Sequence, residues 1–180
     1  LDGDGNCVSM AAAFVANGTT EQTGDFALSG SGSLGGNLDV SGQFVRLIHR
    51  VHGNGPVDTT QNGPIASRTL TFPKRHDDTG IRITWQDNRR VMGSAGACRY
   101  SIRVNGADCT DPGPLDHDFY INNGANRHQA STITSTCFGV PAGATTVSIE
   151  VTNSIHGQPP GQVYTGWYNS YWSIEAEEVY

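Results

Sequence analysis

The sequence predicts an all-β protein, folded as a sandwich of two antiparallel sheets. Hydrophobic and polar residues alternate in several segments, which is the period of a strand with one buried face. Gly, Pro or Asn separates nearly all of these segments, as in the turns of a sandwich. The composition agrees, because 23 glycines and only 16% charged residues are typical of a turn-rich β protein. We expect one domain over residues 1–180, a length that can bury a sizeable core.

The N-terminal third of the chain has the least regular pattern. We expect strands interrupted by glycine in "CVSMAAAFVANG", "GDFALSG", "GNLDVSG" and "GQFVRLIHRVHG". The stretch "SGSGSLGG" has the composition of a flexible linker, but its strand-like flanks favour a loop within one sheet. Residues 1–62 are therefore expected to add N-terminal strands to the same domain.

Four later segments carry the clearest alternation: "IRITW", "CRYSIRV", "TVSIEVT" and "YWSIEAEEV". Their inward positions should form one core, made of Ile81, Ile83, Trp85, Cys98, Tyr100, Ile102, Val104, Val147, Ile149, Val151, Trp172, Ile174 and Ala176. Their outward positions should face water, namely Arg82, Thr84, Arg99, Ser101, Arg103, Ser148, Glu150, Thr152, Ser173, Glu175 and Glu177. A tight reversal is expected at Asn105-Gly106. Shorter strands should fill the intervals at "RTLTF", "DFYIN" and "STIT".

Charge and cysteine content limit the classes of partner. The formal net charge of −6 leaves no basic stripe for phosphates, which argues against nucleic acid. The longest apolar stretch, "MAAAFVA", is far shorter than the roughly 20 residues of a membrane span.

The cysteines and a glycosylation sequon point to the cellular compartment. The chain has four cysteines, Cys7, Cys98, Cys109 and Cys137, and Asn17 begins the sequon. These features favour a secreted glycoprotein with two disulfides whose signal peptide has been removed; four buried thiols in a cytosolic protein are the alternative.

Metal and catalytic motifs are not predicted. Asp2, Asp4 and Asn6 resemble the start of a calcium loop, but Cys7 and Ala13 stand where that loop needs Gly and Glu. Acidic groups at residues 76–78 and 116–118 are not interpreted as cation sites, since the second follows Pro112, Gly113 and Pro114 at a loop-to-strand junction, where Asp is a common turn residue. The six histidines show no zinc-binding spacing, and no nucleophile elbow, phosphate loop or dinucleotide fingerprint occurs. We expect no catalytic residues, no metal and no cofactor.

Aromatic residues gather near the C-terminus. Trp172 continues the alternation of the last strand and is expected in the core. Tyr164, Trp167 and Tyr168 follow no regular period and should lie in a loop with Asn169. Flat aromatic faces beside amides suit sugar rings, so these four residues are the candidate ligand-binding site. The alternative is a subunit contact or a loop anchor.

From about residue 63 to residue 179 the chain resembles the C-terminal globular domain of collagen triple helix repeat-containing proteins, secreted glycoproteins of the animal extracellular matrix. The resemblance depends on "IASRTLTFPKRHDDTGIRITW", "CRYSIRVNGADC", "STIT" with "STCFG", and "YTGWYNSYWSIEAEEV". The collagen-like repeat of the family is not present here. Ser67 stands where the family has a cysteine, and only Cys98 remains of an adjacent cysteine pair.

The resemblance implies a jelly-roll-like sandwich similar to the trimeric heads of complement and tumour-necrosis-factor proteins, and hence a homotrimer. It pairs Cys109 with Cys137, which lie in the best-matching segments, and leaves Cys7 for Cys98. The function expected is a secreted, extracellular, non-enzymatic oligomeric binding protein whose partners are a glycan, a matrix protein or a small ligand. Alternatives are a soluble lectin, a carrier of a hydrophobic pigment or lipid, and a secreted hydrolase, for which the sequence has no motif.

Overall fold

The computed structural model describes residues 47–93, 96–122 and 126–179. Regular structure in these residues consists of nine strands, β1 to β9. Their bounds are β1 Ile48–Asn54, β2 Asn62–Lys74, β3 Gly80–Met92, β4 Gly96–Val104, β5 Leu115–Ile121, β6 Asn126–Cys137, β7 Gly143–Asn153, β8 Gln162–Thr165 and β9 Tyr171–Val179. The all-β prediction is confirmed.

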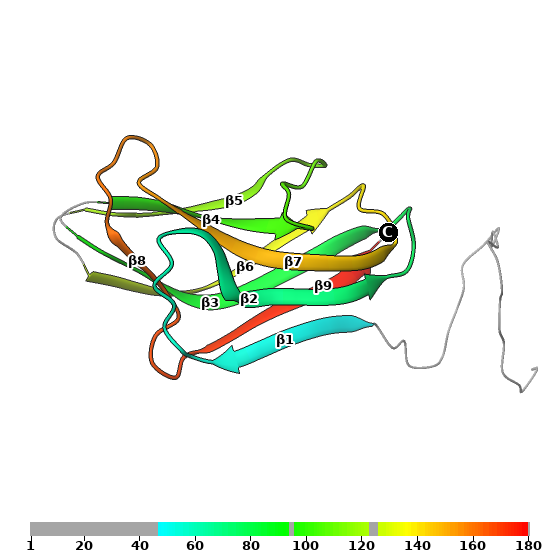
Figure 1. The fold of residues 1–180 in the computed structure, drawn as a ribbon, viewed down its shortest axis with the longest axis horizontal. Coiled ribbons are helices and arrows are strands. Elements are labelled where there is room, and N and C mark those ends of the chain that lie inside the picture. The colour runs from blue at the N-terminus through cyan, green and yellow to red at the C-terminus, as the bar shows by residue number, and fades with distance from the viewer. Residues whose placement is uncertain (1–46, 94–95, 123–125, 180) are drawn as a thin grey trace, which may run out of the picture. The chain divides into compact units, whose positions relative to one another are not determined.

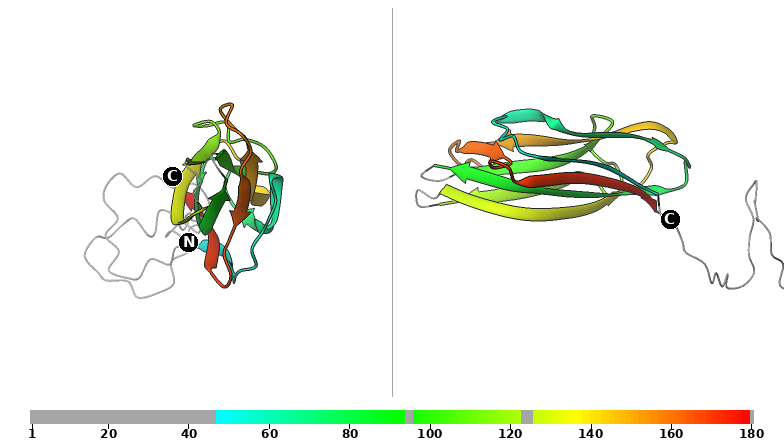
Figure 2. Two further views of the ribbon diagram at one scale, coloured as in Figure 1. Left: turned by 90° about the vertical axis from the view of Figure 1, so that its left-hand side faces the viewer. Right: turned by 90° about the horizontal axis from the view of Figure 1, so that it is seen from below.

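The strands form two antiparallel sheets that lie as two layers (Figures 1 and 2). We call the sheet with the order β1-β9-β3-β6 sheet A, and the sheet with the order β2-β7-β4-β5 sheet B. In sheet A, β3 pairs with β9 along its first half and with the short β8 along its second half. Each sheet thus joins early strands to late ones, the Greek-key arrangement of a jelly roll. The predicted jelly-roll-like sandwich is confirmed.

The core lies between the inner faces of the two sheets. Every residue that the alternation predicts to point inward is buried, with at most 7% of its surface exposed. Across the layers, the ring of Trp85 on β3 lies 5.3 Å from the ring of Tyr100 on β4. The period-two pattern therefore places these side chains correctly without any knowledge of which strands pair.

Three residues predicted to face water are buried instead: Ser101, Ser173 and Glu177. All three lie on the outer faces of strands that are flanked on both sides, β4 in sheet B and β9 in sheet A. Ser101 donates a hydrogen bond to Asp116 on β5, and Glu177 forms an ion pair with Arg82 on β3.

Part of the N-terminal prediction lies outside the described residues. The second half of "GQFVRLIHRVHG" lies in β1, Ile48–Asn54, which pairs with β9, as a strand was expected there. The three earlier segments, the sequon at Asn17 and the acidic residues of the N-terminus lie beyond the described ranges. The assignment of residues 1–46 to the same domain stays a prediction.

The cysteines agree only in part with expectation. A disulfide joins Cys109, before β5, to Cys137 at the end of β6, as predicted. Cys98 is a free thiol, completely buried on the inner face of β4. The predicted Cys7–Cys98 disulfide is therefore wrong, because the alternation that turns Cys98 into the core also encloses its sulfur between the sheets. Its expected partner, Cys7, lies outside the described residues.

Candidate functional site: an aromatic cluster on the outer face of sheet A

The candidate site is built on one row of residues across three strands. Tyr164 on β8 and His128 on β6 are both register partners of Arg90 on β3. In this part of β3, Val91 points into the core and Arg90 lies on the outer face of sheet A. Trp167 and Tyr168, in the loop between β8 and β9, pack beside this row. We call these five residues the aromatic cluster.

The guanidinium group of Arg90 lies at the centre of the aromatic cluster. Its carbon is 4.6 Å from the centroid of the Tyr164 ring and 4.3 Å from that of Trp167, both within the range of a cation–π contact. Nε of Arg90 also donates to Oδ1 of Asn126 at 2.7 Å. Trp167 in turn meets His128 and Tyr168 edge to face, with 4.6 Å between centroids in each case. The rings are therefore held by mutual contacts.

Backbone hydrogen bonds fix the loop that carries Trp167 and Tyr168. The amide of Gly166 donates to the carbonyl of Asn88 at 2.7 Å, and the amide of Ser170 donates to the carbonyl of Trp167 at 2.8 Å. The hydroxyl of Ser170 accepts from the Trp167 amide at 2.8 Å. Tyr168 has a φ of 46°, a left-handed conformation that is uncommon for a bulky residue. Such conformations persist where the surroundings impose them, and they gather at functional sites.

A buried ion pair lies directly beneath this loop. Nε of Arg68 on β2 is 2.8 Å from Oδ2 of Asp87 on β3, and both side chains are almost completely buried. Trp172 covers the Arg68 guanidinium at 4.3 Å, and its indole nitrogen donates to the Gly55 carbonyl at 3.0 Å. A Cβ atom built on Gly166 would lie only 2.8 Å from the Arg68 side chain. The pair therefore supports the underside of the loop.

Burial dominates the electrostatics of this pair. It raises the pKa of Asp87, and the hydrogen bond and charge of Arg68 counteract only part of that rise. Arg68 reaches Asp87 because β2 shifts register between Pro64 and Thr69, an irregularity that reorients the side chains between them.

The four predicted site residues lie in one region. Tyr164 and Trp167 are half-buried, whereas Tyr168 is 73% exposed and Asn169 beside it is exposed. Trp172, expected in the core, is buried below them. Sequence analysis missed Arg90 and His128, which complete the aromatic cluster. Extending the alternation of "IRITW" through "QDNRRVM" would have placed Arg90 on the outer face of the strand.

The acidic group at residues 116–118 lies at the start of β5, directly after a loop, as the predicted loop-to-strand junction requires. Asp116 and Asp118 share the outer face of sheet B and both form ion pairs with Arg99, at 3.1 and 2.8 Å. The hydrogen bond from Arg99 is the main cause that lowers the pKa of Asp118 to about 2, and His156 contributes as well. Arg99 thus occupies the position that a cation would take. In the described ranges, no three His, Cys, Asp or Glu side chains are grouped as metal ligands.

The comparison with known families establishes the family of this chain. The model of the CTHRC1 C-terminal domain family matches residues 51–174. The chain belongs to this family. The predicted resemblance is confirmed, and the matched region begins within β1, earlier than the motifs indicate. Proteins of the CTHRC1 family are extracellular, secreted proteins. In the described part of this CTHRC1-type chain, no helix is both long and apolar enough to cross a membrane.

Solved structures show weaker similarity. The globular domain of zebrafish complement 1qA protein has 13% identity and a TM-score of 0.41, with 76% of this chain and 98% of that chain covered. Dimeric latent PorU from Porphyromonas gingivalis has 13% identity and a TM-score of 0.44, with 81% of this chain but only 14% of that chain covered. The strand topology and the family match, rather than these structures, identify the fold.

Proposed function

We propose that this chain is a secreted, non-enzymatic binding protein of the extracellular matrix or body fluid that acts as a homo-oligomer through the aromatic cluster. The observation that carries the proposal is Tyr168, whose side chain is 73% exposed on a loop with a fixed backbone. A rigid aromatic side chain loses little conformational entropy when a partner covers it. Aromatic residues and arginine are also the types most enriched at protein interfaces.

Other features of sheet A support self-association. Ile48 on β1 and Tyr171 on β9 lie on the same outer face and are 48% and 39% exposed. Membership of the CTHRC1 family favours a trimer, as the resemblance implies. The Cys109–Cys137 disulfide and the sequon at Asn17 support secretion, with Asn17 as the site of glycosylation.

The test of assembly is light scattering on the full chain. Trp167→Ala removes the ring that links Arg90, His128 and Tyr168, so the oligomeric mass should fall. The control is Tyr120→Ala, which removes a 49% exposed tyrosine from β5 of sheet B and should leave the mass unchanged. An oligomer that withstands Trp167→Ala, or a wild-type chain that is monomeric at all concentrations, would contradict assembly through this surface.

A second candidate function is that of a soluble lectin. The exposed Tyr168 ring beside the Asn169 amide favours it, because a sugar offers an apolar face and a rim of hydroxyls to such a pair. Tyr168→Ala should leave the mass intact and reduce glycan binding more than fivefold, the usual effect of losing an aromatic anchor. A glycan array on the wild type, Tyr168→Ala and Tyr120→Ala separates this function from self-association; equal binding by all three excludes Tyr168 as the contact.

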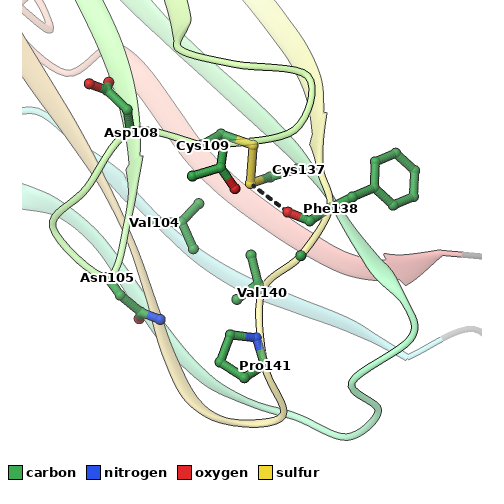
Figure 3. Close-up of a pocket in the computed structure, with 10 residues that line it drawn as sticks. Val104, Asn105, Asp108, Cys109, Cys137, Phe138, Val140 and Pro141 are labelled. Carbon is green, nitrogen blue, oxygen red and sulfur yellow. Dashed lines mark hydrogen bonds between the residues drawn. A yellow bond between two sulfur atoms is a disulfide. The ribbon is translucent and has the colours of Figure 1, made fainter.

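The carrier of a pigment or lipid receives no support. The two pockets described have volumes of about 150 and 90 Å³. The first lies beside the Cys109–Cys137 disulfide (Figure 3) and the second on the outer face of β1, β3 and β9. Both are smaller than the roughly 300–1,000 Å³ of pockets that enclose such ligands.

A further inference from the structure

A second buried arginine lies inside the sandwich, away from the aromatic cluster. Arg89 on β3 is only 6% exposed. Its guanidinium carbon lies 5.5 Å from the ring centroids of Tyr100 on β4 and Phe119 on β5, and its Nε donates to the hydroxyl of Ser131 on β6 at 2.8 Å. Its Nη1 atom is buried and has no hydrogen-bond partner in the described part of the chain.

The positive charge of Arg89 has no acidic partner among the described residues. Asp87, on the same inward face of β3, is committed to Arg68 at 2.8 Å. Asp118 on β5 points outward to Arg99, also at 2.8 Å. A buried charge without a counter-charge is strongly unfavourable in a protein interior, so this arrangement calls for a compensating group.

Asp87 attracts the charge of Arg89 but is already paired with Arg68, and the other titratable side chains around Arg89 do not supply a negative charge. Burial raises the pKa of Cys98 to about 12 and raises the pKa of Tyr100 further above its ordinary value, so both are neutral at pH 7. Burial lowers the pKa of His117, and the nearby charge of Arg89 lowers it further. None of these three groups is thus an anion at neutral pH.

His117 presents a second unfilled hydrogen-bonding position. It is the register partner of Tyr100, and its Nε2 atom is buried without a partner. Its neighbour on the same face of β5, Phe119, lies under the Arg89 guanidinium. Because β5 is the edge of sheet B and the rest of the His117 ring is partly exposed, this position has a route to solvent.

We propose that Arg89, His117 and Ser131 form an internal binding site for a small monovalent anion such as chloride. The anion accepts hydrogen bonds from Nη1 of Arg89 and from the protonated Nε2 tautomer of His117, and it supplies the missing counter-charge. It thereby links β3 of sheet A to β5 of sheet B. This site is separate from the aromatic cluster and does not depend on the function proposed for it.

Thermal unfolding of the full chain tests the proposal. Sodium chloride is varied at constant ionic strength, with sodium gluconate as the bulky replacement. A ligand of the folded state should raise the melting temperature of the wild type by roughly 3–6 °C for each tenfold increase in chloride above the dissociation constant. Arg89→Met keeps the contact with the rings but removes the charge, so its melting temperature should not respond to chloride.

A comparison of the stability of Arg89→Met and the wild type at low chloride adds a second test. Without chloride, Arg89→Met should be at least as stable as the wild type, because the uncompensated charge is gone, and the order should reverse at high chloride. Arg103→Gln is the control, since Arg103 pairs with Asp108 and Glu150 at the outer face of sheet B. It should keep the chloride response of the wild type.

Diffraction from wild-type crystals grown in sodium bromide provides a readout that requires no variant to fold. An anomalous peak within hydrogen-bonding distance of Nη1 of Arg89 is expected. A chloride response that persists unchanged in Arg89→Met, or bromide data with no peak beside Arg89, would overturn the site.

Discussion

The outer face of sheet B and the aromatic end of sheet A differ in what surrounds their arginine side chains. On sheet B, the arginines are satisfied by carboxylates of neighbouring strands and loops. Arg99 pairs with Asp116 and Asp118, and Arg103 pairs with Glu150 and Asp108. This face makes its polar contacts within the molecule.

The aromatic end of sheet A has a different chemistry. Arg90 lies between two rings and no carboxylate pairs with it in the described ranges. Tyr168 is 73% exposed to solvent. Ion pairs do occur elsewhere on this face, between Arg50 and Glu175 and between Arg82 and Glu177. The charge of Arg90 is thus met by rings and not by a carboxylate, and this difference is the reason why we propose the aromatic end of sheet A, rather than sheet B, as the contact for a partner.

The largest effect is expected from removing the support beneath the aromatic loop. Asp87→Ala leaves the Arg68 charge buried and alone, so the free energy of unfolding should fall by about 3–5 kcal/mol. Urea denaturation measures it. The double variant Arg68→Met/Asp87→Leu should recover most of this loss, because it leaves no buried charge unpaired. A loss below about 1 kcal/mol for Asp87→Ala would show that the pair does not support the loop.

Replacing either of two glycines with similar φ angles by alanine should lower the free energy of unfolding by a smaller amount. Gly166, in the aromatic loop, has a φ of 79°, and a Cβ there would meet Arg68 at 2.8 Å and the Pro56 carbonyl at 3.0 Å. Gly106, in the turn after β4, has a φ of 76° but open space around it. Gly106→Ala should lower stability by about 1 kcal/mol through backbone strain alone. Gly166→Ala should lower it by about 2–3 kcal/mol, since the clash adds to the strain; equal losses would mean that the loop yields freely.

The smallest expected change in stability comes from losing the ion pairs of Asp118 on sheet B. Arg99 and then His156 hold the pKa of Asp118 at about 2, below the value of about 3.9 in an unfolded chain. A lowered pKa stabilises the fold at pH values above about 4, and this contribution is lost as the pH falls from about 4 to about 2. Because the Asp118 side chain is 40% exposed, solvent screening limits the contribution to less than about 1 kcal/mol.

Urea midpoints of the wild type and Asp118→Asn at two pH values check this expectation. The wild type should be slightly more stable at pH 7, and the two should agree near pH 2. The same difference at both pH values would indicate that Asp118 acts through packing and not through its charge.

Local pattern was sufficient to predict the core but not the arrangement between strands. Alternation places Trp85, Tyr100 and Ile174 inward because side-chain direction is a property of one strand. The burial of Ser173 and Glu177 depends on β9 lying between β1 and β3, which no single segment reveals. In the same way, the free thiol at Cys98 follows from its inward position once both sheets are in place.

The residues of the candidate site likewise fall into those that sequence alone indicates and those that only strand pairing brings together. Tyr164, Trp167, Tyr168 and Asn169 are close in sequence, so composition alone indicated them. Arg90 and His128 join them only through the register of β3 with β8 and β6, and Arg68 reaches Asp87 only through an irregularity in β2. Such contacts are set by sheet pairing, which one sequence does not determine.

The disulfide between Cys109 and Cys137 also affects how the chain responds to proteolysis. It encloses all of β5 and nearly all of β6, which are one edge strand of each sheet. A protease that cuts once between these cysteines produces two fragments that remain covalently joined. Such a nicked chain should migrate as one species on a gel without reductant and separate into two only after reduction.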